Sequence, residues 1–196
     1  LDGAAHLCSE LLASDPANAK ALAMLGMIHL QHGMLPEGME LLRASLQQQP
    51  EQPDMLNNLG RALHMTGNCE AALRQFEQAL GLAPDYLGAL FNQGNVLYDL
   101  KRYEEAAASF ERVVELQPGH MDARLNLGIA LKDLGRTEEA LAQFERVAET
   151  SPHRADVHCN RGLLLLEMRR YEESLSSFER AMHLAPQFAE ALNGAG

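Results

Sequence analysis

The chain has 196 residues, of which 46% are hydrophobic and 22% charged, and its formal net charge is −11. This charge repels phosphate backbones, and no basic patch in the sequence offsets it, so we expect no nucleic-acid partner. There is no run of 18 apolar residues, no basic start typical of a signal peptide and no CxxC cysteine pair. These absences predict a cytoplasmic protein without membrane insertion.

Glycine and proline each recur along the chain at an interval of 34 residues. The glycines are Gly26, Gly60, Gly94, Gly128, Gly162 and Gly196, and the prolines are Pro16, Pro50, Pro84, Pro118, Pro152 and Pro186. A sustained period of this length is typical of a helical repeat array, which grows by stacking and has no central core. The sequence therefore predicts an all-α solenoid.

Placing each glycine at position 8 of a unit divides the whole chain. In chain order we expect residues 1–18 to be the second helix of a truncated repeat, and residues 189–196 to be the start of another. The five full repeats between them are 19–52, 53–86, 87–120, 121–154 and 155–188. Because the chain begins and ends inside repeats, we expect it to be a segment of a longer protein.

Each repeat carries two apolar stripes at helical spacing. In repeat 53–86 the stripes are Leu56, Leu59, Leu63 and then Ala72, Phe76, Ala79, separated by the turn Thr66-Gly67-Asn68. This pattern predicts two antiparallel helices per repeat, about twelve helices in all and no strand. The expected breaks lie near Gly33, Gly67, Lys101, Gly135 and Arg169.

The position-8 glycine lies inside the first helix, where it costs about 0.5–1 kcal/mol relative to alanine. We expect close approach of the second helix to offset this cost. Small residues at position 20 are the expected facing surface: Ala72, Ala106, Ala140 and Ser174.

These positions resemble the tetratricopeptide repeat, and the resemblance covers the whole chain. Position 24 reads Leu42, Phe76, Phe110, Phe144 and Phe178, and position 27 reads Ser45, Ala79, Val113, Val147 and Ala181. The resemblance implies a right-handed superhelix of antiparallel helix pairs whose first helices line a concave groove. Polar residues before the glycine, as in Asn92-Gln93-Gly94, are also similar to the repeat arm of bacterial Spindly-type O-linked N-acetylglucosamine transferases.

Position 6 lies on the concave side in this family. It reads Met24 in the first repeat and asparagine in the others: Asn58, Asn92, Asn126 and Asn160. We call these four residues the asparagine ladder. An amide offers both donors and acceptors, so the ladder could hold the backbone of an extended peptide. The alternative is that these side chains are only hydrated.

Carboxylates at positions 2 and 13 are expected to flank the ladder: Asp54, Asp122, Asp156, Asp99, Asp133 and Glu167. They would favour a basic or amide-rich ligand, unless they are simply a solvated face. Lys20, Arg61 and Lys132 interrupt the acidic stripe. Asn95 is the one match to the carboxylate clamp of co-chaperone repeats, so we do not expect such a clamp.

Apolar residues complete the expected groove. Met24 and Met27 suit an adaptable binding surface, although they could instead pack against an upstream repeat, and Phe91 and Leu125 are candidate anchors between the asparagines. Arg124 and Arg161 stand where the family pattern has large apolar residues. Each is either a functional cation or packs its methylene groups over the core with its charged group at the edge.

The leading hypothesis is a non-catalytic scaffold that binds a protein or peptide in its concave groove. The alternative is a substrate-recognition arm of a larger enzyme such as an O-linked glycosyltransferase. No phosphate-binding loop or nucleophile motif occurs, and neither His29-x-x-His32 nor the group His153, His158 and Cys159 has the partners of a metal site. We therefore expect no enzyme activity, no cofactor and no metal. Exposed repeat ends could allow self-association.

Overall fold

The structure is a computed structural model that describes residues 2–186 of the chain. Every regular element among those residues is a helix, so the all-α prediction is confirmed for them. The expected helix in residues 189–196 lies outside the described residues. The helices are α1 (Asp2–Ser14), α2 (Ala19–Gln31), α3 (Leu35–Gln48), α4 (Pro53–Met65), α5 (Cys69–Leu82), α6 (Leu87–Asp99), α7 (Tyr103–Leu116), α8 (Met121–Asp133), α9 (Thr137–Thr150), α10 (Ala155–Glu167) and α11 (Tyr171–Leu184).

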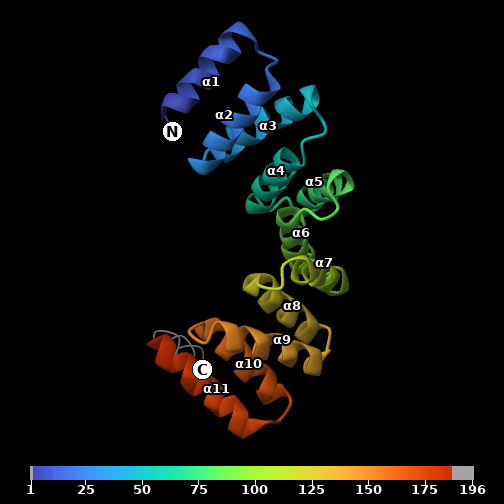
Figure 1. Cartoon of the computed structure of the whole chain (residues 1–196), viewed down its shortest axis with the longest axis vertical. Helices are drawn as coiled ribbons and strands as arrows, with labels where there is room; N and C mark the ends of the chain where they lie inside the picture. Colours follow the sequence, from blue (N-terminus) through green and yellow to red (C-terminus); the bar gives the residue numbers. More distant parts are fainter. Residues whose placement is uncertain (1, 187–196) are drawn as a thin grey trace. The chain divides into compact units, whose positions relative to one another are not determined.

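The chain forms two compact units, Leu1–Leu100 and Lys101–Gly196. In the first unit α2 packs on α3 and α4 packs on α5, and the first helices α2, α4 and α6 contact their neighbours in that order. In the second unit α8 packs on α9, α10 packs on α11, and α8 contacts α10 (Figure 1). Each unit is therefore a stack of helix pairs, with its first helices side by side.

All five expected breaks are turns in which one residue adopts a positive φ. Three are glycines, Gly33, Gly67 and Gly135, with φ of 77°, 78° and 75°. At the other two the residues are Lys101 and Arg169, each with φ of 60°. At Gly67 the amides of residues 67 and 68 return to the carbonyls of His64 and Leu63, at 2.8 and 2.9 Å. These bonds satisfy carbonyls that the end of the helix leaves open.

In three repeats the position-8 glycine, Gly60, Gly128 or Gly162, is packed against an aromatic ring of the second helix. A Cβ on Gly128 would lie 2.5 Å from Cε1 of Phe144, and one on Gly60 would lie 2.6 Å from Cε1 of Phe76. Both rings are fully buried. The expectation that position 20 provides the facing surface was therefore incomplete, because the position-24 ring occupies the space where the Cβ would be.

Position 20 does contact the backbone at this crossing. In the last repeat, Oγ of Ser174 donates a hydrogen bond of 2.8 Å to the carbonyl of Gly162. In the first repeat position 20 is Gly38, and its carbonyl would lie 3.1 Å from a Cβ on Gly26. The small residue thus allows the two backbones to approach, and the large ring fills the remaining space.

Candidate functional site

The asparagine ladder lies on the first helices, with two members in each unit. Asn58 and Asn92 lie on α4 and α6, and Asn126 and Asn160 lie on α8 and α10, all of them half-buried. Met24, which has the same repeat position on α2, is 49% exposed. The four asparagines share a position but differ in what they contact.

Asn92 is tied to the neighbouring repeat. Its Nδ2 donates to Oδ1 of Asn57 at 2.9 Å, and Nδ2 of Asn57 lies 3.4 Å from the phenol oxygen of Tyr86. Asn57 is only 6% exposed. Burial, together with a hydrogen bond to Asp54, raises the pKa of Tyr86, so its phenol stays protonated and donates to the carboxylate. Asn92 therefore joins α6 to α4 and is not wholly available to a ligand.

Sequence reasoning gave no role to Asn57 or Tyr86. The available signal was the pair Asn57-Asn58, because two adjacent residues point in directions about 100° apart on a helix. One of them had to turn into the packing between repeats. Asn160 is also partly engaged, since its Nδ2 donates to the carbonyl of Asp156 on its own helix at 2.9 Å.

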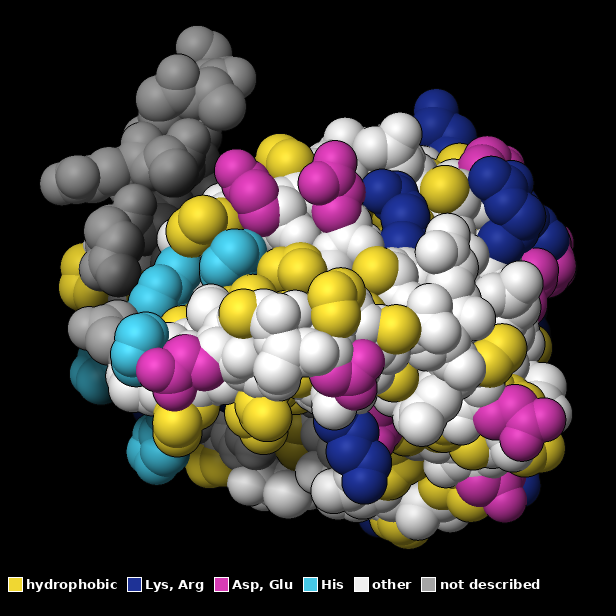
Figure 2. Space-filling model, turned by 90° about the horizontal axis from the view of Figure 1, so that it is seen from above, with side chains coloured by type: hydrophobic (Ala, Val, Ile, Leu, Met, Phe, Trp, Pro, Cys, Tyr) yellow, Lys and Arg dark blue, Asp and Glu magenta, His cyan; other side chains and the backbone are white. Residues whose placement is uncertain are grey.

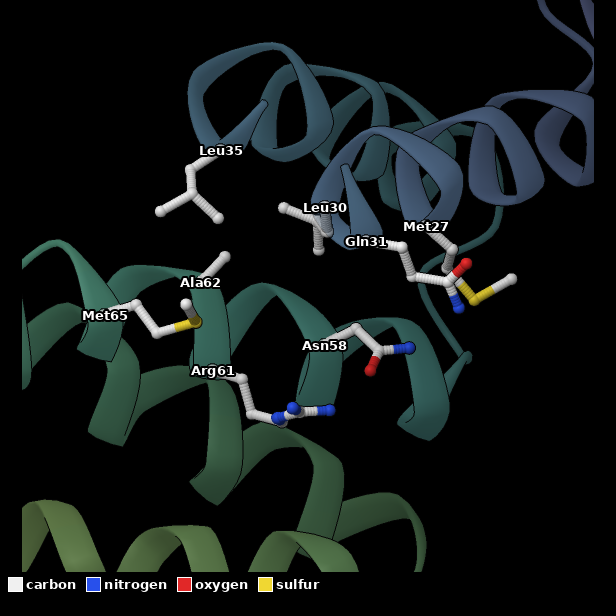
Figure 3. Close-up of a pocket in the computed structure, with 8 residues that line it drawn as sticks. All are labelled: Met27, Leu30, Gln31, Leu35, Asn58, Arg61, Ala62 and Met65. Atoms are coloured by element: carbon white, nitrogen blue, oxygen red, sulfur yellow. The ribbon is translucent and has the colours of Figure 1, made fainter. Parts of the chain in front are cut away.

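Asn58 makes no side-chain hydrogen bond within residues 2–186, and it lines a pocket of about 230 Å³. We call this the α2/α4 pocket, because most of its residues come from those two helices (Figure 3). Its lining residues are Met27, Leu30, Gln31, Leu35, Asn58, Arg61, Ala62 and Met65. The structure thus brings together three of the expected site residues: Met27, Asn58 and Arg61.

Four carboxylates of the expected acidic flank have partners in the chain. Nη1 of Arg154 lies 2.5 Å from Oδ1 of Asp122, and its Nη2 lies 2.7 Å from Oδ2 of Asp156. Hydrogen bonds from Arg154 lower the pKa of the Asp156 carboxyl, and both aspartates contribute to raising the pKa of Arg154. Asp99 pairs with His64 at 2.6 Å, and Asp133 lies 3.1 Å from Nζ of Lys132.

Four of the six carboxylates therefore have charged or ionisable partners, and the interpretation of an open acidic stripe was wrong for them. The sequence analysis did not predict a role for Arg154, which stands at the last position of a repeat. From that position it reaches Asp122 of its own repeat and Asp156 of the next one.

The apolar candidates differ in exposure. Phe91 and Met27 are half-buried, and so is the polar candidate Asn95. Leu125 is only 6% exposed, so the expectation that it anchors a ligand was wrong. Its side chain contributes to the packing of α8.

The two unusual cations both reach toward second helices. Arg124 donates to Oε1 of Gln143 at 3.0 Å and to the carbonyl of Pro118 at 3.1 Å, and burial lowers its pKa. Arg161 donates to Oγ of Ser177 at 2.7 Å. These contacts support the interpretation that both side chains lie over the core and end at its edge.

Hydrophobic side chains also reach the surface among charged ones, on the face seen in Figure 2. On α1, Leu7 and Leu11 are 61% and 52% exposed, and self-association through such residues stays a prediction. Within residues 2–186, no three His, Cys, Asp or Glu side chains are grouped to hold a metal ion. In the same part of the chain, every helix is too short or too polar to cross a membrane.

Family models described as tetratricopeptide repeat match four stretches of the chain: 1–61, 57–120, 91–155 and 155–188. No curated protein sequence matches it. Among solved structures, YrrB, described as a TPR protein with an unusual peptide-binding site, has a TM-score of 0.86 at 22% identity. The match covers 97% of this chain and 98% of YrrB.

Structures of MamA are also similar. MamA from Desulfovibrio magneticus RS-1 has a TM-score of 0.83 at 23% identity, over 86% of this chain and 96% of that protein. MamA AMB-1 has a TM-score of 0.73 at 27% identity, over 83% of this chain and 96% of that protein. These matches agree with the helix pairs described above.

Proposed function

Because the chain belongs to the tetratricopeptide repeat family, we propose that it is a non-catalytic scaffold that binds an extended segment of a partner protein. The binding surface is the face formed by α2, α4 and α6, the first helices of the first unit. The observation that carries the proposal is the placement of Asn58 and Asn92, one repeat apart on the adjacent helices α4 and α6.

The spacing of these amides suits a peptide backbone. Packed helices lie about 8–10 Å apart, and an extended chain rises about 3.3 Å per residue. Amides on neighbouring first helices would therefore meet about every third residue of the peptide. An asparagine can accept from a peptide N–H and donate to a peptide carbonyl, so it holds the backbone without selecting the side chain.

How much each asparagine can contribute to peptide binding depends on the hydrogen bonds that its side chain already makes. Within residues 2–186 the side chain of Asn58 makes no hydrogen bond, whereas one donor of Asn92 is used by Asn57. The proposal is also supported by the similarity to YrrB, which is described as having a peptide-binding site. The pairing of Asp122 and Asp156 with Arg154 argues against selection of a strongly basic ligand in the second unit.

Selection from a phage-displayed library of random 12-residue peptides on the whole chain tests the proposal. A synthetic peptide from that selection is then titrated against Asn58→Ala and Asn58→Asp. Loss of one or two hydrogen bonds should weaken binding of the peptide about 2- to 12-fold for each bond. Asn68→Ala is the matched control, because Asn68 is an exposed asparagine in the turn between α4 and α5.

Two results would contradict the proposal. The library could yield no peptide that binds the folded chain, or the selected peptides could bind the Asn58 variants as tightly as wild type. The second result would move the binding surface away from the first helices.

A further inference from the structure

The α2/α4 pocket has two chemically different ends (Figure 3). At one end α2, α3 and α4 present apolar side chains: Leu30, Leu35, Ala62 and Met65. At the other end lie the polar side chains Gln31, Asn58 and Arg61, together with Met27. An occupant that matches both ends must carry an apolar group beside a polar or charged one.

Arg61 is the charged group of this pocket, and it forms no ion pair within residues 2–186. Other arginines of the chain do: Arg102, Arg112, Arg136, Arg154 and Arg170 each pair with Asp or Glu at 3 Å or less. The carboxylate nearest in sequence on the same helix is Asp54, and it already accepts a hydrogen bond from the Tyr86 phenol. In a chain of net charge −11, Arg61 is therefore an exposed cation that interacts with the Tyr86 phenol but pairs with no carboxylate within residues 2–186.

We propose that this pocket takes an aliphatic or methionine side chain of the bound peptide, and that Arg61 pairs with an Asp or Glu two residues away. The proposal rests on the peptide-binding function proposed above and specifies its ligand. Residues i and i+2 of an extended chain point to the same side, about 7 Å apart. That separation lets one side chain enter the apolar end while the other faces the guanidinium.

The pocket lining predicts loose selection of the apolar residue and strict selection of the acidic one. Met65 lines the apolar end of the pocket, and an unbranched thioether adapts to ligands of different shape. Leucine, isoleucine and methionine should therefore all fit. The guanidinium of Arg61, in contrast, offers a rigid fork that matches the geometry of a carboxylate.

The first test uses the peptides selected from the 12-residue library. They should be enriched in an aliphatic residue or methionine followed or preceded, two positions away, by Asp or Glu. One such peptide and its counterpart with Gln in place of the acidic residue then serve as the two probes. Added NaCl should weaken binding of the acidic probe more than binding of the Gln probe.

Charge removal at two arginines provides the matched comparison. Arg61→Gln should weaken binding of the acidic probe about 2- to 5-fold and change binding of the Gln probe less than about twofold. Arg74→Gln makes the same charge change at an exposed arginine of α5, which lines a different hollow between α3, α4 and α5. It should leave the affinity of both probes unchanged. Arg61→Lys, which keeps the charge, should recover part of the affinity.

A second pair of variants tests the apolar end. Met65 is 69% exposed and Leu82 is 44% exposed, so neither substitution removes a core residue. Met65→Ser should weaken binding of both probes to the same extent, about 3- to 10-fold. Leu82→Ser, on α5, should leave both affinities as they are.

The outcomes separate this inference from the function on which it rests. If the library yields no binding peptide, both are wrong. If peptides bind and depend on Asn58 but show no acidic residue at the stated spacing, only this inference is wrong. If Arg61→Gln weakened binding of both probes equally, this inference would also be wrong, because the arginine would then act on the fold of the pocket.

Discussion

Gly128 of α8 is packed so closely against Phe144 that even one methyl group should destabilise the second unit. A Cβ built on Gly128 would lie 2.5, 2.8 and 3.1 Å from Cε1, Cδ1 and Cζ of the ring. Phe144 is 0% exposed, so the ring has no open space to enter. Overpacking of a core costs about 1–3 kcal/mol, whereas alanine gains about 0.5–1 kcal/mol over glycine in a helix.

The overpacking cost is the larger of these two effects, so Gly128→Ala should destabilise the chain by about 1–2 kcal/mol. Gly128→Leu should cost more. For a chain of this size, 1 kcal/mol moves the thermal midpoint by roughly 2–4 °C. The control is Gly81→Ala in α5, because a Cβ there meets nothing within 4 Å. It should stabilise the chain by up to about 1 kcal/mol.

Circular dichroism melting of both variants is the assay, and the two midpoints should move in opposite directions. Phe144→Leu adds a test of mechanism, since a smaller side chain relieves the contact. Phe144→Leu should lower the free energy of unfolding less in the Gly128→Ala background than in wild type, so the effects of the two substitutions should be non-additive. A higher midpoint for Gly128→Ala would refute the reasoning, because the ring would then have room to move.

Three further predictions concern the turns, the asparagines and the acid pair. Arg169→Gly should stabilise the chain by about 0.5–1 kcal/mol in a thermal melt, because a φ of 60° costs a non-glycine residue roughly 1–2 kcal/mol and glycine loses part of this gain through entropy. Asn92→Ala should destabilise it by about 1–3 kcal/mol in urea, because Oδ1 of buried Asn57 loses its hydrogen-bond donor; an unchanged unfolding midpoint would contradict this prediction. Because Arg154 lowers the folded-state pKa of Asp156, the pair stabilises the fold above the unfolded pKa of about 3.9 and loses that contribution as the pH falls through the folded value. Asp156→Asn should therefore flatten the decline in stability below about pH 5, whereas an unaltered pH profile would show that the pair contributes nothing.

The period of the sequence was sufficient to predict the helices and turns. The glycine and proline spacing placed a break near Lys101 and Arg169, although neither residue is a turn former by itself. Register carried that prediction, because each residue stands where Gly33, Gly67 and Gly135 stand in other repeats. A periodic sequence specifies backbone structure well, since every unit must stack on a similar neighbour.

Side-chain partners were harder to predict from the same period. Whether Asn57 or Asn58 would turn into the packing depends on the rotation of α4 against α6, which the sequence spacing does not give. The pairing of Arg154 with Asp122 joins residues 32 positions apart, and it depends on the path of the turn before α10. Sequence alone thus identified the polar face but could not tell which of its groups were already paired.

Identical residues at one repeat position therefore have different capacities to bind a ligand. Among the residues that the structure describes, Asn58 has no hydrogen-bond partner for its side chain, Asn92 bridges two helices, and Asn160 is bonded to its own helix. Arg61 likewise lacks the ion pair that Arg154 has. The unpaired amide and the unpaired cation both lie in the α2/α4 pocket, beside two methionines. Binding energy in protein interfaces usually comes from a few residues. In this chain those residues should lie at the junction of the first two full repeats, with Asn92 serving mainly to hold α4 and α6 in register.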